Sequence, residues 1–203
     1  MEKFKAIIFD LGGVLIDIDY SKTQLAFEQL GINNFNDLYC QANQQELFDQ
    51  FETGQISAQH FINKLLVYFS EPISPNKIVH AWNAMILDFQ IEKLELLEHL
   101  STQYPLFLLS NTNELHVPVV RQRLAKHTTK NLEDYFSHVY LSNEIEMRKP
   151  ATSIFEFVCT ENKLDPATTL FIDDSIQHIE GAKKAGLQTL HLTSDQNLLT
   201  YFS

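Results

Sequence analysis

The stretch Lys5-Ala6-Ile7-Ile8-Phe9-Asp10-Leu11-Gly12-Gly13 decides the fold of this 203-residue chain. The apolar run up to Phe9 is typical of a strand that is buried on both faces. A carboxylate followed by two glycines marks the end of the strand and a tight turn. The sequence therefore predicts a central parallel strand that places Asp10 at its carboxyl end.

Four further segments resemble this strand, and helical patterns separate them. Strands are expected over residues 106–109, 139–141, 169–172 and 188–192, and helices over 91–100, 114–126, 151–162 and 176–185. This alternation predicts an α/β fold with a doubly wound parallel sheet. Ligands of such sheets bind at the carboxyl ends of the strands.

Residues 21–88 break the alternation and show helical patterns instead, over 22–30, 44–51, 58–69 and 75–87. We therefore expect an all-helical cap inserted into a Rossmann-like core. The predicted cap covers residues 19–88, and the predicted core is formed by residues 1–18 together with 89–203. A cleft between the two is the expected place for a site.

Composition restricts the class of protein. Apolar residues make up 44% of the chain and charged residues 20%, and no apolar run approaches the length of a membrane span. The first residues run directly into a strand, which favours a soluble cytoplasmic protein. A net charge of -11 disfavours binding to nucleic acid or to anionic membranes. Cys40 and Cys159 lie far apart, so two reduced thiols are expected.

The polar residues that end the strands carry the chemistry. They are Asp10, Ser110, Asn111, Asp173 and Asp174. Lys149 follows the third strand, and in a parallel sheet all of these residues converge on one edge. A carboxylate nucleophile, acids for a divalent cation, hydroxyl and amide donors and a lysine are what phosphoryl transfer requires.

Four motifs carry a specific resemblance. They are Phe9-Asp10-Leu11-Gly12-Gly13-Val14-Leu15, Leu109-Ser110-Asn111-Thr112-Asn113, Arg148-Lys149-Pro150 and Phe171-Ile172-Asp173-Asp174-Ser175. In sequence and order they resemble the motifs of the haloacid dehalogenase-like hydrolases with a helical cap. The resemblance implies a Mg²⁺-dependent phosphatase that acts on a small phosphomonoester, such as a sugar-1-phosphate, through an aspartyl phosphate. It gives no oligomeric state.

The resemblance also implies the roles of individual residues. Asp10 is the expected nucleophile, and Lys149 neutralises the nucleophile and the phosphate. Ser110 and Asn111 bind the phosphate together with Lys149. The expected magnesium ligands are the Asp10 carboxylate, the Gly12 carbonyl and Asp174, with Asp173 binding directly or through water.

The sequence departs from the family pattern at Gly12, where most of these phosphatases have an aspartate that acts as general acid and base. The leaving group of a sugar-1-phosphate needs less protonation than that of an alkyl phosphate. Four residues are considered as substitutes, although each is more often structural: Asp17, Asp19, His116 and His178. Arg148 is expected to pair with Glu144 or Glu146, and Glu144 could instead orient Lys149.

Two other functions remain open. A binding or regulatory module that has lost catalysis would explain Gly12. A 2-haloacid dehalogenase also uses an aspartate without the second acid, but it works without metal and would not need the pair Asp173 and Asp174.

Overall fold

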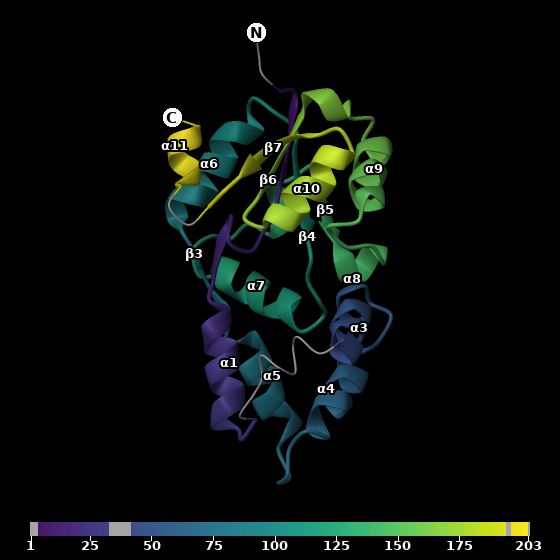
Figure 1. The fold of residues 1–203 in the computed structure, drawn as a ribbon. Coiled ribbons are helices and arrows are strands. Elements are labelled where there is room, and N and C mark those ends of the chain that lie inside the picture. Colours follow the sequence, from purple (N-terminus) through teal and green to yellow (C-terminus); the bar gives the residue numbers. More distant parts are fainter. Residues whose placement is uncertain (1–3, 33–41, 194–195, 203) are drawn as a thin grey trace.

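The computed structural model describes residues 4–32, 42–193 and 196–202 of the chain. Five parallel strands form its sheet in the order β5-β4-β1-β6-β7 (Figure 1). They are β1 (Ala6–Phe9), β4 (Leu106–Ser110), β5 (His138–Leu141), β6 (Thr169–Asp173) and β7 (Gln188–His191). The predicted α/β fold class is confirmed, and β1 is the central strand.

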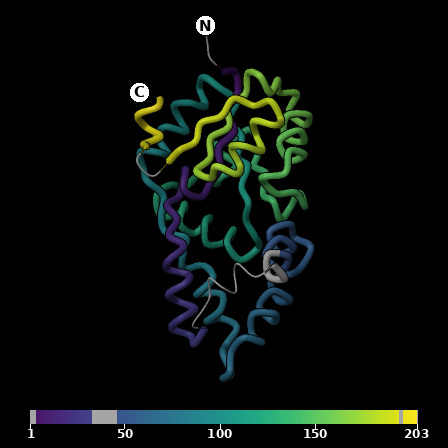
Figure 2. The backbone as a smooth tube through the Cα atoms, viewed as in Figure 1, coloured from purple at the N-terminus to yellow at the C-terminus, as the bar shows by residue number. Residues whose placement is uncertain are grey.

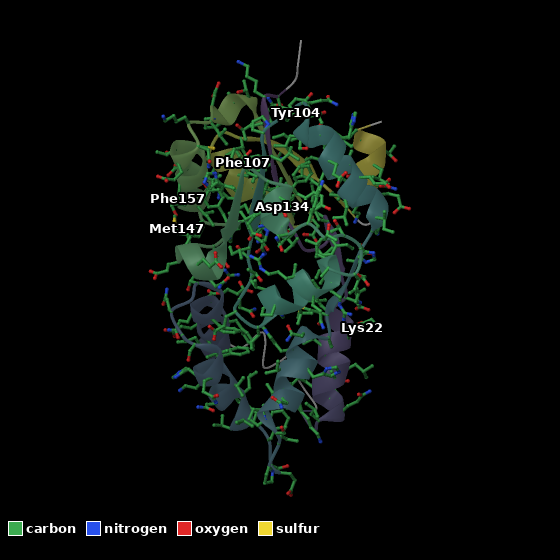
Figure 3. All side chains as sticks on the ribbon, turned by 180° about the vertical axis from the view of Figure 1, so that it is seen from behind. Lys22, Tyr104, Phe107, Asp134, Met147 and Phe157 are labelled. Atoms are coloured by element: carbon green, nitrogen blue, oxygen red, sulfur yellow. The ribbon has the colours of Figure 1, made fainter. Side chains whose placement is uncertain are left out.

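Alternate residues of β1 pack on opposite faces of the sheet. Ile7 and Phe9 join one hydrophobic cluster and Ala6 and Ile8 another. The first face is covered by α6 (Ile91–Ser101), α7 (His116–Leu124) and α11 (Leu198–Tyr201) and the second by α9 (Thr152–Glu161) and α10 (Ile176–Lys184). Figure 3 shows Phe107 and Phe157 of the second cluster among the packed side chains. The sheet is therefore doubly wound.

Short elements connect the longer ones on the core. The helix α8 (Ser142–Ile145) follows β5 directly, and single 3₁₀ turns lie at Leu132–Asp134 and Pro166–Thr168. The sequence patterns did not predict these elements, because each is about one turn long and shows no periodicity. α8 matters for the site, because it contacts the helix at Ala42–Glu52, which lies beyond the carboxyl edge of the sheet.

A second group of helices lies beyond the carboxyl edge of the sheet (Figures 1 and 2). It contains α1 (Tyr20–Gln29), α3 (Ala42–Glu52), α4 (Ala58–Leu66) and α5 (Pro75–Asn83). Aromatic rings form its core, where Phe61 contacts Phe48, Phe51 and Trp82, and Phe48 stacks on Trp82. We refer to α1, α3, α4 and α5 as the cap helices.

The prediction of a helix over residues 75–87 is wrong at its end. α5 stops at Asn83, and an antiparallel ribbon of β2 (Ile16–Ile18) and β3 (Ile86–Phe89) joins the cap helices to the sheet layer. The Thr23 hydroxyl donates to the carbonyl of Trp82 and accepts from the amide of Met85, which satisfies the backbone after the helix end. β2 ends at the predicted boundary at residue 18 and β3 crosses the one at residue 88, and both boundaries stay a prediction.

Two further features concern expectations from composition. No helix within the described ranges is long and apolar enough to cross a membrane. Cys159 is buried and its thiol is free, whereas Cys40 lies outside the described residues.

Candidate active site

The predicted polar residues meet at the carboxyl edge of the sheet. Asp10 follows β1, Ser110 ends β4 and Asp173 ends β6, and all three are buried. Asp10 and Ser110 line a cavity of about 400 Å³ between the sheet and the cap helices. The cavity lining includes Asp10, Gly12, Ser110, Asn111 and Asp174 from the predicted set, and also Glu52, Trp82, His116, Arg148 and His178.

Lys149 lies at the floor of this site, fully buried. Its Nζ is 2.7 Å from Asp10 Oδ1 and 2.7 Å from Asp173 Oδ2. Nδ1 of His178 lies 3.0 Å from each oxygen of Asp173, and the amide of Ser175 donates to Asp173 Oδ1 at 2.8 Å. The oxygens of Asp173 are thus occupied by protein donors, whereas only one oxygen of Asp10 meets Lys149.

Burial and the ion pairs set the protonation of these groups. Burial raises the pKa of Asp10 to about 7, although the charge of Lys149 opposes the rise. Burial opposes the charge of Lys149 too, but the two carboxylates overcome it and raise the pKa of Lys149. For Asp173, the Lys149 and His178 contacts outweigh burial and lower its pKa. Lys149 therefore carries its charge at neutral pH.

Asn111 fixes the backbone of Lys149 from the neighbouring loop. Asn111 Nδ2 donates to the carbonyl of Lys149, and the amide of Lys149 donates to Asn111 Oδ1, both at 2.9 Å. The hydroxyl of Ser142 holds the same loop by accepting from the amide of Thr112 and donating to its carbonyl. Glu144 is exposed, so the backbone of Lys149 is positioned by Asn111 instead.

The carboxylates at this edge fit a divalent cation. Asp10 and Asp173 converge on Lys149, the buried cation that faces them among the described residues, and Asp174 lines the cavity directly after Asp173 in the chain. Burial and the neighbouring Asp173 raise the pKa of Asp174, although the charges of Lys149 and His178 oppose the rise. Hard oxygen ligands of this kind suit Mg²⁺. One possible set of ligand atoms, from Asp10, Asp173 and His178, lies within 4.8 Å of one another.

Gly13 allows Asp174 to approach the loop after β1. Its φ is +72°, and a Cβ built there would lie 2.1 Å from Asp174 Oδ2. Any side chain at this position would push the carboxylate away from the backbone of residues 11–13. The second glycine of the opening motif therefore lets the Asp174 carboxylate lie against the backbone at Gly13, the residue after the Gly12 carbonyl that is predicted to hold magnesium.

Because residue 12 is glycine, the first motif lacks the second acid that would act as general acid and base. A Cβ at Gly12 would lie 3.2 Å from Cγ1 of Ile18, so a larger side chain would require Ile18 to move. Asp17 pairs with Gln90 and Lys93, and Asp19 caps α1 through the Ser21 amide. Neither Asp17 nor Asp19 lines the cavity. His116 and His178 do line it.

His116 has a defined tautomer. Asn83 Nδ2 donates to the Val79 carbonyl, which turns Asn83 Oδ1 toward His116 Nδ1 at 2.8 Å. Nδ1 therefore carries the proton and Nε2 has the lone pair. The ring stacks on Trp82 with an interplanar angle of 6°, and burial lowers the pKa of His116 to about 3. His116 is thus a neutral hydrogen-bond acceptor on the cavity wall.

The predicted partners of Arg148 are wrong. Its Nη1 pairs with Asp49 and its Nη2 lies 2.9 Å from Glu52 Oε2, both on α3. Sequence reasoning placed the partners nearby at Glu144 and Glu146, because contacts between segments distant in the chain leave no local pattern. Glu52 was therefore missed as a site residue, although it lines the cavity.

Comparisons with known proteins agree with this architecture. The family model for haloacid dehalogenase-like hydrolases matches residues 4–186. D-ribitol-5-phosphate phosphatase of Bacteroides thetaiotaomicron is 31% identical over 91% of this chain and 90% of its own length. A sesquiterpene phosphatase of Aspergillus oryzae is 28% identical, covering 94% and 90% respectively.

A solved structure extends the likeness to the whole fold. An enzyme of the family from Bacteroides thetaiotaomicron, in complex with magnesium and inorganic phosphate, superimposes with a TM-score of 0.90. It is 33% identical, and the match covers 98% of this chain and 100% of that one. The sequence motifs, the sheet order and these matches show that the chain belongs to the haloacid dehalogenase-like hydrolase family.

Proposed function

We propose that this hydrolase is a magnesium-dependent phosphatase that transfers the phosphoryl group of a small metabolite to Asp10 and then to water. The observation that carries this proposal is Lys149, which is buried between Asp10 and Asp173 behind the cavity that Asp10 and Asp174 line. Relatives named as phosphatases support it.

Each residue of the site has its own role in phosphoryl transfer. A carboxylate oxygen of Asp10 attacks phosphorus, while the Lys149 ammonium stabilises negative charge on the phosphoryl oxygens. Ser110 and the loop at Asn111 orient the phosphoryl group from the neighbouring strand. Asp10, Asp174 and the Gly12 carbonyl would hold Mg²⁺, with Asp173 behind them, and the bound ion would supply Lewis-acid stabilisation of the phosphoryl oxygens.

The retained acids argue against the two alternatives. A module that had lost catalysis would have no need for a charged lysine buried between two carboxylates, because such groups are costly to bury. A 2-haloacid dehalogenase would not need Asp174 near the nucleophile. Both observations favour phosphate chemistry.

The substrate that we propose is a phosphorylated sugar or sugar alcohol. A sugar-1-phosphate is compatible with the lack of an acid at Gly12, because its leaving group needs less protonation. The ribitol-5-phosphate phosphatase among the relatives supports a polyhydroxylated substrate. His116 offers an uncharged acceptor for a hydroxyl group beside the flat indole of Trp82. Assays should therefore compare sugar-1-phosphates with polyol phosphates that carry the phosphate on a primary alcohol.

Asp174→Ala tests the magnesium site and with it the proposed function. We expect wild-type phosphate release to require Mg²⁺ and to stop with a chelator. The variant should need at least about tenfold more Mg²⁺ for half-maximal activity, because it loses a direct ligand. Lys149→Met is the comparison, since it should lower turnover without a similar shift in Mg²⁺ requirement. Equal magnesium dependence of Asp174→Ala and wild type would contradict the assignment.

His116→Phe tests the recognition of hydroxyl groups. The phenyl ring keeps the stacking on Trp82 but removes the acceptor Nε2. The loss of one neutral hydrogen bond should raise KM for a sugar or polyol phosphate by about 2- to 12-fold. KM for p-nitrophenyl phosphate, which has no sugar hydroxyl group for His116 to bind, should not change. A parallel rise for both substrates would show that the ring only shapes the cavity.

A further inference from the structure

The proposed reaction lacks a proton donor on the first motif, because Gly12 replaces the usual acid. Departure of an alkoxide without a proton costs roughly 10² to 10⁴ in rate. Asp17 and Asp19 do not line the cavity. His116 has no proton to give, since its protonated nitrogen is bound to Asn83. A donor to an alkyl leaving group must therefore come from elsewhere.

In-line transfer defines where such a donor must lie. The attacking and leaving oxygens lie on opposite sides of phosphorus. Asp10 follows β1 at the carboxyl edge of the sheet, and the cap helices lie beyond that edge (Figure 1). An oxygen that leaves on the side opposite Asp10 therefore faces the cap helices. His178 lies on α10 of the core and contacts Asp173, on the side of the nucleophile. A residue of the cap helices that lines the cavity meets the requirement better.

Glu52, the last residue of α3, is such a residue. The chain after it reaches the core at Gly54, whose φ is +68° and whose added Cβ would lie 2.2 Å from the carbonyl oxygen of Asn143 in α8. This backbone contact brings the end of α3 against the sheet layer. The side chain of Glu52 is 19% exposed, and its Oε2 meets Arg148 at 2.9 Å.

The charges around Glu52 suit a group that gives and takes a proton. Arg148 is shared with Asp49, so its charge is divided between two carboxylates. Burial raises the pKa of Glu52 to about 7, and the charge of Lys149 opposes this rise. A pKa near neutral pH suits acid and base catalysis by one group, whereas the ion pair with Arg148 favours the carboxylate form of Glu52.

Resting on the proposed phosphatase function, we propose that Glu52 is the general acid and base of this enzyme, delivered by α3 to the side of the cavity opposite Asp10. It takes the role that Gly12 cannot perform. The proton donor then belongs to the cap helices, while the nucleophile belongs to the sheet.

The two half-reactions balance with this assignment. In the first, Asp10 forms a bond to phosphorus, the bond from phosphorus to the substrate oxygen breaks, and the proton of Glu52 moves to that oxygen to give the alcohol. In the second, the Glu52 carboxylate takes a proton from water, the water oxygen bonds to phosphorus, and the bond to Asp10 breaks. Inorganic phosphate leaves, and Asp10 and Glu52 return to their starting states. Water enters where the alcohol left, so one residue serves both steps.

Glu52→Gln tests the proposal through the basicity of the leaving group. The glutamine keeps the shape of the side chain, and Arg148 keeps its contact with Asp49. For a polyol phosphate, kcat/KM should fall by roughly 10² to 10⁴. For p-nitrophenyl phosphate, whose phenolate leaves without a proton, kcat/KM should stay close to wild type. Its kcat should fall, because hydrolysis of the intermediate has lost its base, so a rapid burst of nitrophenol should precede a slow steady state.

Asp49→Asn is the matched control. Asp49 shares Arg148 with Glu52, but its side chain is 54% exposed. An exposed pair of this kind contributes little to stability, so the variant should stay folded and keep the wild-type ratio of the two kcat/KM values. Melting temperatures of both variants should show that the fold is kept.

The wild-type enzyme separates failure of this inference from failure of the proposed function. If it shows no magnesium-dependent release from either substrate, the phosphatase function is wrong. If it is active but Glu52→Gln lowers kcat/KM equally for both substrates and shows no burst, Glu52 only docks the cap helices.

Discussion

Asp10→Asn should reduce turnover by at least about 10⁴-fold for every phosphomonoester, because an amide cannot replace the carboxylate nucleophile. The fold should be kept. Asparagine has nearly the same volume, and Lys149 retains Asp173 at 2.7 Å as a partner for its charge. Steady-state phosphate release and a thermal melt of the same preparation check both expectations.

The control for Asp10→Asn is Asp174→Ala, which changes the magnesium site but keeps the nucleophile. Asp174→Ala should regain part of its activity as Mg²⁺ is increased, whereas Asp10→Asn should stay inactive at every concentration. Activity of purified Asp10→Asn above a trace would mean that phosphorus is attacked by another group, and the proposed mechanism would be abandoned.

Lys149→Met should be the most destabilising of the site variants, and its turnover should also fall steeply. The change leaves Asp10 and Asp173 buried beside each other without their shared cation. Breaking a buried ion pair by removing one partner costs about 3–5 kcal/mol. Loss of a charge that faces the transferred phosphoryl group costs roughly 10² to 10³ in kcat. Denaturant unfolding and phosphate release measure the two effects.

A second substitution separates stability from catalysis at this position. In Lys149→Met with Asp173→Asn, one of the two uncompensated charges is gone, so part of the lost stability should return while activity should not. A Lys149→Met protein as stable as wild type would show that the ion pairs contribute no net stability. Full activity in it would remove Lys149 from the mechanism.

The sheet could be predicted from the sequence because its strands are buried on both faces. Runs such as Ala6–Phe9 and Leu106–Ser110 are almost wholly apolar, and each ends at a polar residue that the fold uses. The convergence of Asp10, Ser110 and Asp173 follows from parallel pairing alone. Sequence patterns were therefore enough to place these residues at the correct edge.

The ribbon of β2 and β3 could not be predicted in the same way. Its strands are three and four residues long and contain Asp17 and Asp88, so they lack a clear alternation. The apolar residues after Asn83 continue the helical pattern of α5 in the sequence. The helix stops there because the backbone after Asn83 bonds to Thr23 on α1, which is a tertiary contact.

Residues that act across the two layers were also beyond sequence reasoning. Nothing in the local sequence links Glu52 to Arg148, and the tautomer of His116 depends on Asn83 from a different helix. Both contacts exist only because the cap helices fold back over the edge of the sheet. The residues that we propose to recognise the substrate and to supply the proton could therefore be identified only from the structure.

The most direct test of the central claim is to trap the phosphorylated enzyme. The protein is mixed with p-nitrophenyl phosphate and Mg²⁺, quenched in acid within the first turnovers, digested and analysed by mass spectrometry. We expect a phosphoryl group on the peptide that contains Asp10, absent with chelator and absent in Asp10→Asn. Turnover without phosphorylation of that peptide, or with phosphorylation of another residue, would contradict the proposed mechanism.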